Sequence, residues 1–344
     1  MKRGRRYVLV SPCRDEEKYL SRTLESIMRQ SVPPALWVVV DDGSTDGTPE
    51  ILERYRAMVD YLRIIRRDNR GFRKVGGGVV DAFDEGLASF DLHDFDYVCK
   101  LDMDLDLPQG YFEGLIRKME ADEILGTCSG KPYFTDKKTG RRVNEVCGDE
   151  MSVGMTKFYR SDCFQEIGGF VKEVGWDIID CHICRMKGWR ARAFDDADLA
   201  FHHLRPMGSS YKSIWHGRVR HGYGQHYLGT HPLYLLATAL YRLNKAPVVM
   251  GALAMVWGYF TAGFQGRPRH PDPAVQRFLR RYQMVALRVG KLRAAELVLA
   301  EVRSRKASQN AAGGQAHDRM AGAGMPQREM KGAAALPRDA GGDR

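Results

Sequence analysis

Two aspartates, Asp102 and Asp104, stand two positions apart directly after the apolar segment 96–101. Alternate residues at the end of a strand point the same way or fan around a turn, so their carboxylates can converge on one hard cation. Mg²⁺ or Mn²⁺ held there would bridge a diphosphate and stabilise it as a leaving group. Because this spacing is common, the other interpretation is a surface loop of solvated aspartates, with Asp106 as a third.

A second acidic group, Asp41 and Asp42, follows the apolar segment 36–40 and opens the run DDGSTDGT, residues 41–48. The glycines permit a tight turn, and the hydroxyl and carboxyl side chains can cap a following helix. Two adjacent carboxylates at a strand end can also accept hydrogen bonds from a nucleobase imide and from ribose hydroxyls. The alternative is a well-capped turn with ordinary solvated aspartates.

Both acidic groups need elements that hold them at one edge of the fold. Strand-like and helix-like segments alternate through the first hundred residues, which predicts an α/β fold with a parallel sheet and helices on both faces. In such sheets ligands bind beyond the carboxyl ends of the strands, where both acidic groups lie. The expected strands are 7–11, 36–40, 61–66, 96–101, 124–134 and 151–160, and the expected helices are 17–30, 48–58, 79–89 and 177–188.

Three motifs occur in a fixed order: VLVSPCRDEEKYLSRTLESIMRQS, VVVDDGSTDGTPEIL and KLDMD. Over roughly residues 5–205, their order and spacing resemble the family 2 inverting glycosyltransferases with the GT-A fold. The resemblance implies a Rossmann-like mixed sheet flanked by helices, and transfer of a sugar from a UDP- or GDP-sugar. It also implies a nucleotide pocket lined by Ser11, Pro12, Asp15, Asp41 and Asp42.

The same resemblance implies a site for the diphosphate and a metal ion. Asp102 and Asp104 would form the metal-binding DxD motif for Mn²⁺ or Mg²⁺, with Asp102 also at the nucleotide sugar. Arg73 or Lys74, in RGFRKVGGG, would approach the nucleotide or its diphosphate; the alternative for this pair is a flexible basic loop. A histidine near His203 joins the metal or the diphosphate in some relatives, so His203 is a candidate third ligand, or else a hydrogen-bonded core histidine.

The family usually places its catalytic base in a Glu-Asp pair at the start of a helix. The corresponding stretch here reads Trp176-Asp177, so a tryptophan replaces the glutamate. Inverting transfer needs a carboxylate to remove the proton of the acceptor hydroxyl as that oxygen attacks the anomeric carbon. We therefore expect Asp177 to be the base, with Asp180, one helical turn further, as an acceptor anchor or as the base itself. The alternative is that Asp177 only caps the helix.

Two arginines further along the chain, Arg218 and Arg220, could clamp a diphosphate. They lie in WHGRVRHG, which loosely resembles the gating segment of processive relatives but lacks its order. Cys181 and Cys184 are spaced like a pair of metal ligands. Because no second pair follows at zinc-finger spacing, we interpret them as small core residues.

The most apolar segments lie at 232–240 and 246–264, and the second approaches the length of about 20 residues that spans a bilayer. Basic residues flank it on both sides, which disfavours a single crossing and favours a hairpin or a monotopic insertion. The periodic, basic segment 274–299 is typical of a membrane-surface helix. It could instead pack on the catalytic domain or on a second subunit.

These patterns predict a catalytic domain over 1–230, a membrane-associating helical region over 231–303, and a disordered tail over 304–344 that is rich in Ala and Gly. The first apolar run is too short for a signal peptide, and seven scattered cysteines fit reduced thiols. We therefore expect a peripheral or monotopic protein at the cytoplasmic face of the inner membrane. The expected acceptor is membrane-linked or a polysaccharide.

A net charge of +10 indicates an anionic partner. The charge gathers at the N-terminus and after residue 200 around apolar segments, which favours lipid over nucleic acid. A sugar-nucleotide pyrophosphorylase or a dehydrogenase would want a glycine-rich phosphate loop after the first strand, where SPCRDEE stands instead. A catalytically inactive, nucleotide-binding relative acting as a membrane-associated scaffold is the alternative that Trp176 leaves open.

Overall fold

A computed structural model describes residues 5–69, 71, 77–205, 214–243 and 249–322, with side chains described up to residue 310. By its internal contacts the chain divides into two units, Met1–Val302 and Arg303–Arg344. The fold that follows is that of the first unit.

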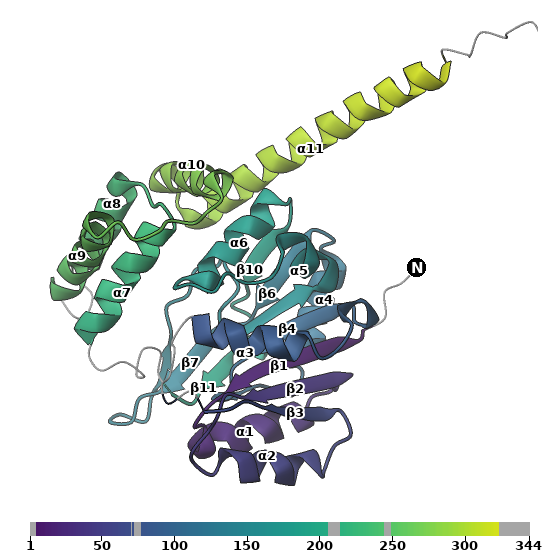
Figure 1. Ribbon diagram of the computed structural model, residues 1–344, viewed down its shortest axis with the longest axis vertical. Helices are drawn as coiled ribbons and strands as arrows, with labels where there is room; N and C mark the ends of the chain where they lie inside the picture. Colours follow the sequence, from purple (N-terminus) through teal and green to yellow (C-terminus); the bar gives the residue numbers. More distant parts are fainter. Residues whose placement is uncertain (1–4, 70, 72–76, 206–213, 244–248, 323–344) are drawn as a thin grey trace, which may run out of the picture. The chain divides into compact units, whose positions relative to one another are not determined.

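A seven-stranded mixed sheet forms the centre of this unit (Figure 1). Its spatial order is β10-β6-β9-β4-β1-β2-β3. Strand β9 runs antiparallel to both of its neighbours, whereas the other pairs are parallel. This confirms the predicted α/β class with a mixed sheet. The strands are β1 (Tyr7–Cys13), β2 (Leu36–Asp41), β3 (Leu62–Arg66), β4 (Tyr97–Leu101), β6 (Leu125–Ser129), β9 (Thr156–Arg160) and β10 (Arg190–Ala193).

Helices cover both faces of the sheet because successive strand residues point to opposite sides. In β1, Tyr7 and Leu9 belong to one buried cluster, with α1 (Glu17–Met28), α2 (Thr48–Arg56) and α4 (Tyr111–Ala121). Val8 and Val10 belong to another, with α3 (Gly77–Leu87), α5 (Ser161–Ile167) and α6 (Trp176–Met186). The 3₁₀ turns η1 (Leu92–Asp94) and η2 (Ala197–Leu199) complete these layers.

A smaller four-stranded sheet has the order β5-β11-β7-β8. Its strands are β5 (Leu105–Asp106), β7 (Pro132–Thr135), β8 (Arg142–Asn144) and β11 (Phe201–His203). Strand β11 pairs His203 with Leu105, one residue after Asp104. This pairing brings a segment near residue 203 to the acidic turn that follows β4.

The C-terminal part of the unit is helical. Its elements are α7 (Ile214–Tyr227), α8 (Pro232–Arg242), α9 (Met250–Phe264), α10 (Pro273–Val289) and the start of α11 (Lys291–Gly322). Helix α10 buries Leu279 and Tyr282 in one cluster with Ile179 of α6 and Val298 of α11. Its apolar side therefore packs on the protein, which is the alternative that the sequence left open for segment 274–299.

Two features bear on the predicted domain scheme. Helix α11 runs on to Gly322, beyond the point at residue 304 from which we expected no regular structure; the alanines in this stretch have high helix propensity. In the part of the chain that the structure describes, no helix is both long enough and apolar enough to cross a membrane. The division into a catalytic domain and a membrane-associating region stays a prediction.

Candidate active site

The carboxyl ends of β1, β2 and β4 meet at one edge of the sheet, and the predicted acidic residues stand at that edge. Cys13 at the end of β1 pairs with Asp41 at the end of β2, and the amide of Asp42 donates to the carbonyl of Cys13 over 2.8 Å. Asp102 directly follows β4, the other neighbour of β1. The parallel pairing thus places both acidic groups at the same edge of the sheet, as expected for residues that follow neighbouring parallel strands.

The DDGSTDGT turn is held by its own side chains and by that of Asp15, in the turn after β1. Asp41 accepts the amide of Ser44 over 2.9 Å, and Asp15 accepts the amide of Thr45 over 2.8 Å. Asp15 itself has a positive φ of 52°. Gly43 has a φ of 73°, and a Cβ there would lie 2.5 Å from the Cα of Asn69. A left-handed backbone against a second loop requires glycine at this position.

Basic side chains that the sequence did not single out surround Asp42. The guanidinium of Arg67 lies 2.7 Å from the Asp42 carboxylate. Arg14 donates to the carbonyl of Asp42 over 3.0 Å and to the side chain of Asn69 over 2.9 Å. Both arginines therefore lie beside Asp42, one of the predicted nucleotide contacts. Contacts between loops that are distant in the sequence bring them there.

Four of the predicted nucleotide contacts need separate mention. Ser11 is fully buried, and its hydroxyl accepts the indole N–H of Trp37 over 2.9 Å, so its side chain joins β1 to β2. Pro12 is partly buried at the end of β1. Arg73 and Lys74 lie outside the described residues.

Asp102 is fixed by its backbone and by a lysine. Its amide donates to the carbonyl of Met155 over 2.8 Å, and its carboxylate forms an ion pair with Lys100. The Lys100 ammonium also donates to the carbonyl of Gly154 over 3.0 Å. Burial raises the pKa of Asp102, against the opposing charge of Lys100.

Asp104 lies in a network of charges from four segments. Its carboxylate is 2.8 Å from the guanidinium of Arg205 and 3.6 Å from the Nε2 of His203. Arg205 also lies 2.7 Å from the carboxylate of Glu16, and the Nδ1 of His203 lies 3.0 Å from Glu145. Burial opposes protonation of His203, but its hydrogen bonds to Asp104 and Glu145 prevail and raise its pKa to about 9. The hydrogen bond from His203 and the positive charge of Arg205 lower the pKa of Asp104 despite its burial.

The donor set suits a hard divalent cation in its chemistry. Asp102 and Asp104 supply carboxylate oxygens, and His203 supplies a ring nitrogen that already faces Asp104. In this arrangement Lys100 and Arg205 neutralise the two carboxylates. Within the described ranges, accordingly, no three His, Cys, Asp or Glu side chains are grouped as metal ligands.

Asp177 lies in the first turn of α6 and faces the segment that holds Asp102. A Cβ on Gly154 would lie 2.9 Å from a carboxylate oxygen of Asp177, so the two groups are in close contact. The side chain keeps some exposure to solvent. Burial nevertheless raises its pKa, against the nearby positive charge of Lys157. A raised pKa suits a carboxylate that must accept a proton.

Asp180 has different surroundings from Asp177. Its carboxylate is buried, accepts a hydrogen bond from Tyr159 and forms an ion pair with the fully buried ammonium of Lys157. Lys157 also donates to the hydroxyl of Ser152 over 3.2 Å. This network occupies the Asp180 oxygens inside the protein, whereas Asp177 faces the site.

Arg218 and Arg220 lie on α7, which begins at Ile214. Both side chains are partly buried. Burial, with the charges of Arg242 and Arg218, lowers the pKa of His221 to about 4. Positive charge therefore gathers between α7 and the end of α8.

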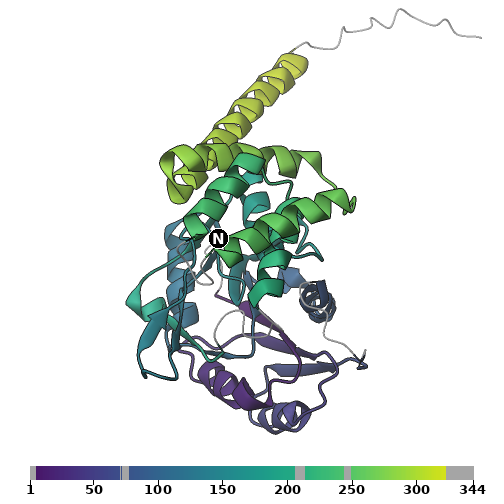
Figure 2. The same ribbon diagram turned by 90° about the vertical axis from the view of Figure 1, so that its left-hand side faces the viewer.

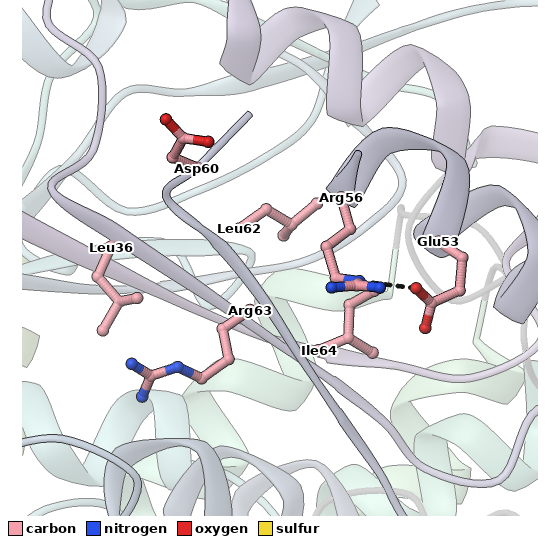
Figure 3. A pocket seen from close by; sticks show the side chains of 7 residues that line it. All are labelled: Leu36, Glu53, Arg56, Asp60, Leu62, Arg63 and Ile64. Carbon is pink, nitrogen blue, oxygen red and sulfur yellow. Dashed lines mark hydrogen bonds and ion pairs between the residues drawn. The ribbon is translucent and has the colours of Figure 1, made fainter. Parts of the chain in front are cut away.

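Two hollows in the described structure can be compared with the acidic edge. One is lined by residues of β2, α2 and β3 at the amino ends of these strands, away from the acidic edge; Figure 3 shows its charged rim, with Arg56 paired to Glu53. The other lies near the acidic site and includes Glu145, the partner of His203. We therefore base the site on the acidic edge and not on the hollow in Figure 3.

Comparison with known proteins adds to this geometry. The model of the family described as Glycosyl transferase family 2 matches residues 8–174, which contain both acidic groups. The chain carries a family 2 glycosyltransferase domain. This confirms, over the matched residues, the family that the three sequence motifs indicated.

Several curated proteins are similar to this chain. It is 25% identical over 148 residues to the glycosyltransferase GlyG of Streptococcus pneumoniae, over 42% of this chain and 45% of that protein. It is 24% identical over 127 residues to the poly-β-1,6-N-acetyl-D-glucosamine synthase of Staphylococcus aureus, over 37% of this chain and 28% of that protein. The match thus spans less than half the length of these relatives.

Two solved structures also resemble this chain. TarS 1–349 of Staphylococcus aureus in complex with UDP-GlcNAc aligns with a TM-score of 0.49 and 15% identity, over 87% of this chain and 92% of that one. A mannosyltransferase from Pyrobaculum calidifontis in complex with GDP-Man and Mn²⁺ aligns with a TM-score of 0.47 and 18% identity, over 86% of each chain.

Proposed function

We propose that this glycosyltransferase transfers one sugar, with inversion, from a UDP- or GDP-sugar to a membrane-linked or polysaccharide acceptor. The observation that carries the proposal is the position of Asp177 beside Gly154. Gly154 also accepts a hydrogen bond from Lys100, which pairs with Asp102. A candidate base and a candidate diphosphate site thus share one short segment of backbone.

The nucleotide would bind across the ends of β1 and β2. Asp41 and Asp42 offer acceptors for a base imide and for ribose hydroxyls, and the DDGSTDGT turn is already fixed by Asp15 and Ser44. Ser11 and Pro12 would shape the floor of this pocket through the backbone of β1. Arg73 and Lys74, which lie outside the described residues, remain candidates for the diphosphate, as do Arg218 and Arg220.

We assign the metal to Asp102 and Asp104, with His203 as a third ligand. Mg²⁺ or Mn²⁺ bound there would offset the charge of the diphosphate and make it a better leaving group. Within the chain, Lys100 pairs with Asp102 and Arg205 pairs with Asp104, so both carboxylates are neutralised by basic side chains. His203 would have to lose its proton before its Nε2 could act as a ligand.

The chemical step follows from the position of Asp177. Its carboxylate accepts the proton of the acceptor hydroxyl as the hydroxyl oxygen forms a bond to the anomeric carbon. The bond from that carbon to the diphosphate breaks on the opposite face, and the nucleoside diphosphate leaves with the electron pair. Trp176 in place of glutamate then changes the surroundings of the base but not the base itself.

Release of nucleoside diphosphate from a panel of nucleotide sugars, with and without Mn²⁺, tests this proposal. We expect metal-dependent release from one donor, and loss of release in Asp104→Ala and Asp177→Ala. Protein that binds UDP or GDP with Mn²⁺ but never turns over a donor, whichever acceptor is supplied, would favour the inactive scaffold. Failure to bind either nucleotide would refute both.

For the cell, we propose a peripheral or monotopic enzyme at the cytoplasmic face of the inner membrane. The basic character of the chain after residue 200 and its apolar helices support this proposal. An acceptor held in the membrane would then reach Asp177 from the side of the C-terminal helices. Subcellular fractionation with and without high salt would check the location.

A further inference from the structure

Helix α9 presents a continuous apolar stripe to solvent. Its members recur at intervals of three and four residues, so they lie along one side of the helix from end to end. They are Met250, Leu253, Trp257, Phe260 and Phe264. Trp257 is 62% exposed and Phe264 is 89% exposed, which is unusual for large apolar side chains.

Helix α8 extends this stripe into a broader surface, which we call the α8–α9 face. Leu235 and Ala239 of α8 pack on Ala252 and Met255 of α9, so the two helices lie side by side. Exposed apolar residues of α8 include Leu233, Leu236 and Leu240. Figure 2 turns this group of helices toward the viewer.

The opposite side of α9 is fixed to the protein by glycines. A Cβ on Gly258 would lie 2.0 Å from the carbonyl oxygen of Val219, and one on Gly222 would lie 2.1 Å from that of Met255. Helices α7 and α9 therefore cross in backbone contact, and α9 cannot rotate to bury its stripe. The exposed stripe is a fixed property of the fold.

The chain segment that contains the α8–α9 face carries ionisable side chains of one sign. Residues 199–271 contain eight lysines and arginines and not one aspartate or glutamate. Arg267 and Arg269 are exposed directly after α9, next to Phe264. A cationic rim around an apolar stripe complements a bilayer of anionic lipids, in which acyl chains meet headgroup phosphates. A second copy of this chain would instead set like charges against each other.

Length decides how the face would meet the bilayer. Helix α9 has 15 residues and is therefore about 22 Å long, shorter than the hydrocarbon core of about 30 Å. All residues of a stripe along the whole helix can contact lipid only if the axis of α9 lies in the plane of the membrane. Trp257 in the middle of the stripe is a residue type that favours the interface.

We propose that the α8–α9 face docks in the plane of an anionic phospholipid membrane, with Met250, Leu253, Trp257, Phe260 and Phe264 entering the acyl boundary. The role of this docking in the cell rests on the proposed function. Helix α10, the amphipathic helix that the sequence singled out, takes no part because its apolar side is buried on α6.

The docked face would lie close to the catalytic base. Helix α7, on which α9 packs, approaches Val174: a Cβ on Gly224 would lie 3.3 Å from a methyl group of that residue. Val174 stands three residues before Asp177. A membrane at the α8–α9 face is therefore joined to the acceptor side of the site through one helix.

Vesicle flotation of the full chain tests the proposal, with vesicles of phosphatidylcholine alone and vesicles that contain phosphatidylglycerol. We expect binding to the anionic vesicles, and a decrease of about a hundredfold or more in the triple variant Leu253→Ser, Trp257→Ser, Phe264→Ser, since each side chain loses its transfer into the acyl region. Val146→Ser is the matched control, because Val146 is 86% exposed on another surface. Arg267→Gln with Arg269→Gln should reduce binding to the anionic vesicles in particular.

Three results would overturn the proposal: no binding of the wild type, equal binding of the triple variant, or a wild-type dimer that the triple variant converts to monomer without any vesicle binding. Turnover of the nucleotide-sugar donor, measured in detergent, tests the proposed function independently of membrane docking. The triple variant should keep wild-type turnover there. Vesicle binding as expected, without turnover by any chain, would leave the docking surface standing and refute the enzyme assignment.

Discussion

The ammonium of Lys100 lies 5.2 Å from the centre of the Trp176 ring while it forms an ion pair with Asp102. A cation over an aromatic face is attracted by the ring quadrupole. Trp176 is the residue that replaces the usual glutamate, and it directly precedes Asp177. The exchange therefore puts an aromatic face, in place of a negative charge, beside the lysine that neutralises the DxD motif.

Asp177→Asn should remove turnover and leave donor binding intact. We expect a decrease in kcat of about a hundredfold to ten-thousandfold, since the amide cannot accept the acceptor proton. The comparison is Glu173→Gln, a change of the same kind at an exposed carboxylate three residues after Phe170 and before α6. Steady-state kinetics and donor titration on both variants check this, and wild-type kcat in Asp177→Asn would remove it from the role of base.

Asp180→Asn should act on folding. It leaves the Lys157 ammonium buried without its counter-charge, which costs about 3–5 kcal/mol when one partner of a buried pair is removed. Denaturant unfolding measures the loss. If the variant were as stable as wild type but inactive, Asp180 would be the base and Asp177 would not.

The pH dependence should report Asp177. Burial raises the pKa of this carboxylate above its ordinary value of about 3.9, and only the ionised form accepts a proton. Activity should therefore fall as the pH falls through this raised pKa, and the acid limb of kcat/KM should lie above the range of an exposed aspartate. A profile without an acid limb down to the pKa of an exposed aspartate would contradict the assignment.

Asp104→Asn should weaken metal-dependent donor binding by about tenfold or more, because it removes a charged ligand and leaves Arg205 with less compensation. Asp106→Asn is the matched control: Asp106 lies in β5 and pairs with Arg22 over 2.8 Å. Calorimetric titration of the donor with and without Mn²⁺ would show the difference. Equal losses in both variants would point to a general electrostatic effect.

Gly258→Ala should destabilise the helical part, because its Cβ would lie 2.0 Å from the Val219 carbonyl and force α7 and α9 apart. Overpacking of this kind costs about 1–3 kcal/mol. Gly263→Ala, in the same helix, is the control, since its Cβ would meet nothing closer than 3.5 Å, a ring atom of His226. Thermal unfolding of both variants checks the crossing.

The sequence by itself determined the sheet edge and most of its acidic residues. Apolar runs of strand length, each followed by a turn rich in polar residues, predict that Asp41, Asp42 and Asp102 lie at strand ends. Local order suffices there, because parallel pairing of β1 with β2 and β4 brings those ends to one edge. The motif order then indicated the enzyme family.

Only the tertiary structure decided what these residues meet. Arg205 forms a hydrogen bond with Asp104 although about a hundred residues separate them in the sequence. Lys157 forms a buried ion pair with Asp180, which distinguishes Asp180 from Asp177, the other candidate base. The helices show the same limit: α9 is apolar all round yet exposes one side to solvent, whereas the apolar side of α10 is buried against α6. Periodicity tells which side of a helix is apolar, but its partner is set by contacts between segments far apart in the chain.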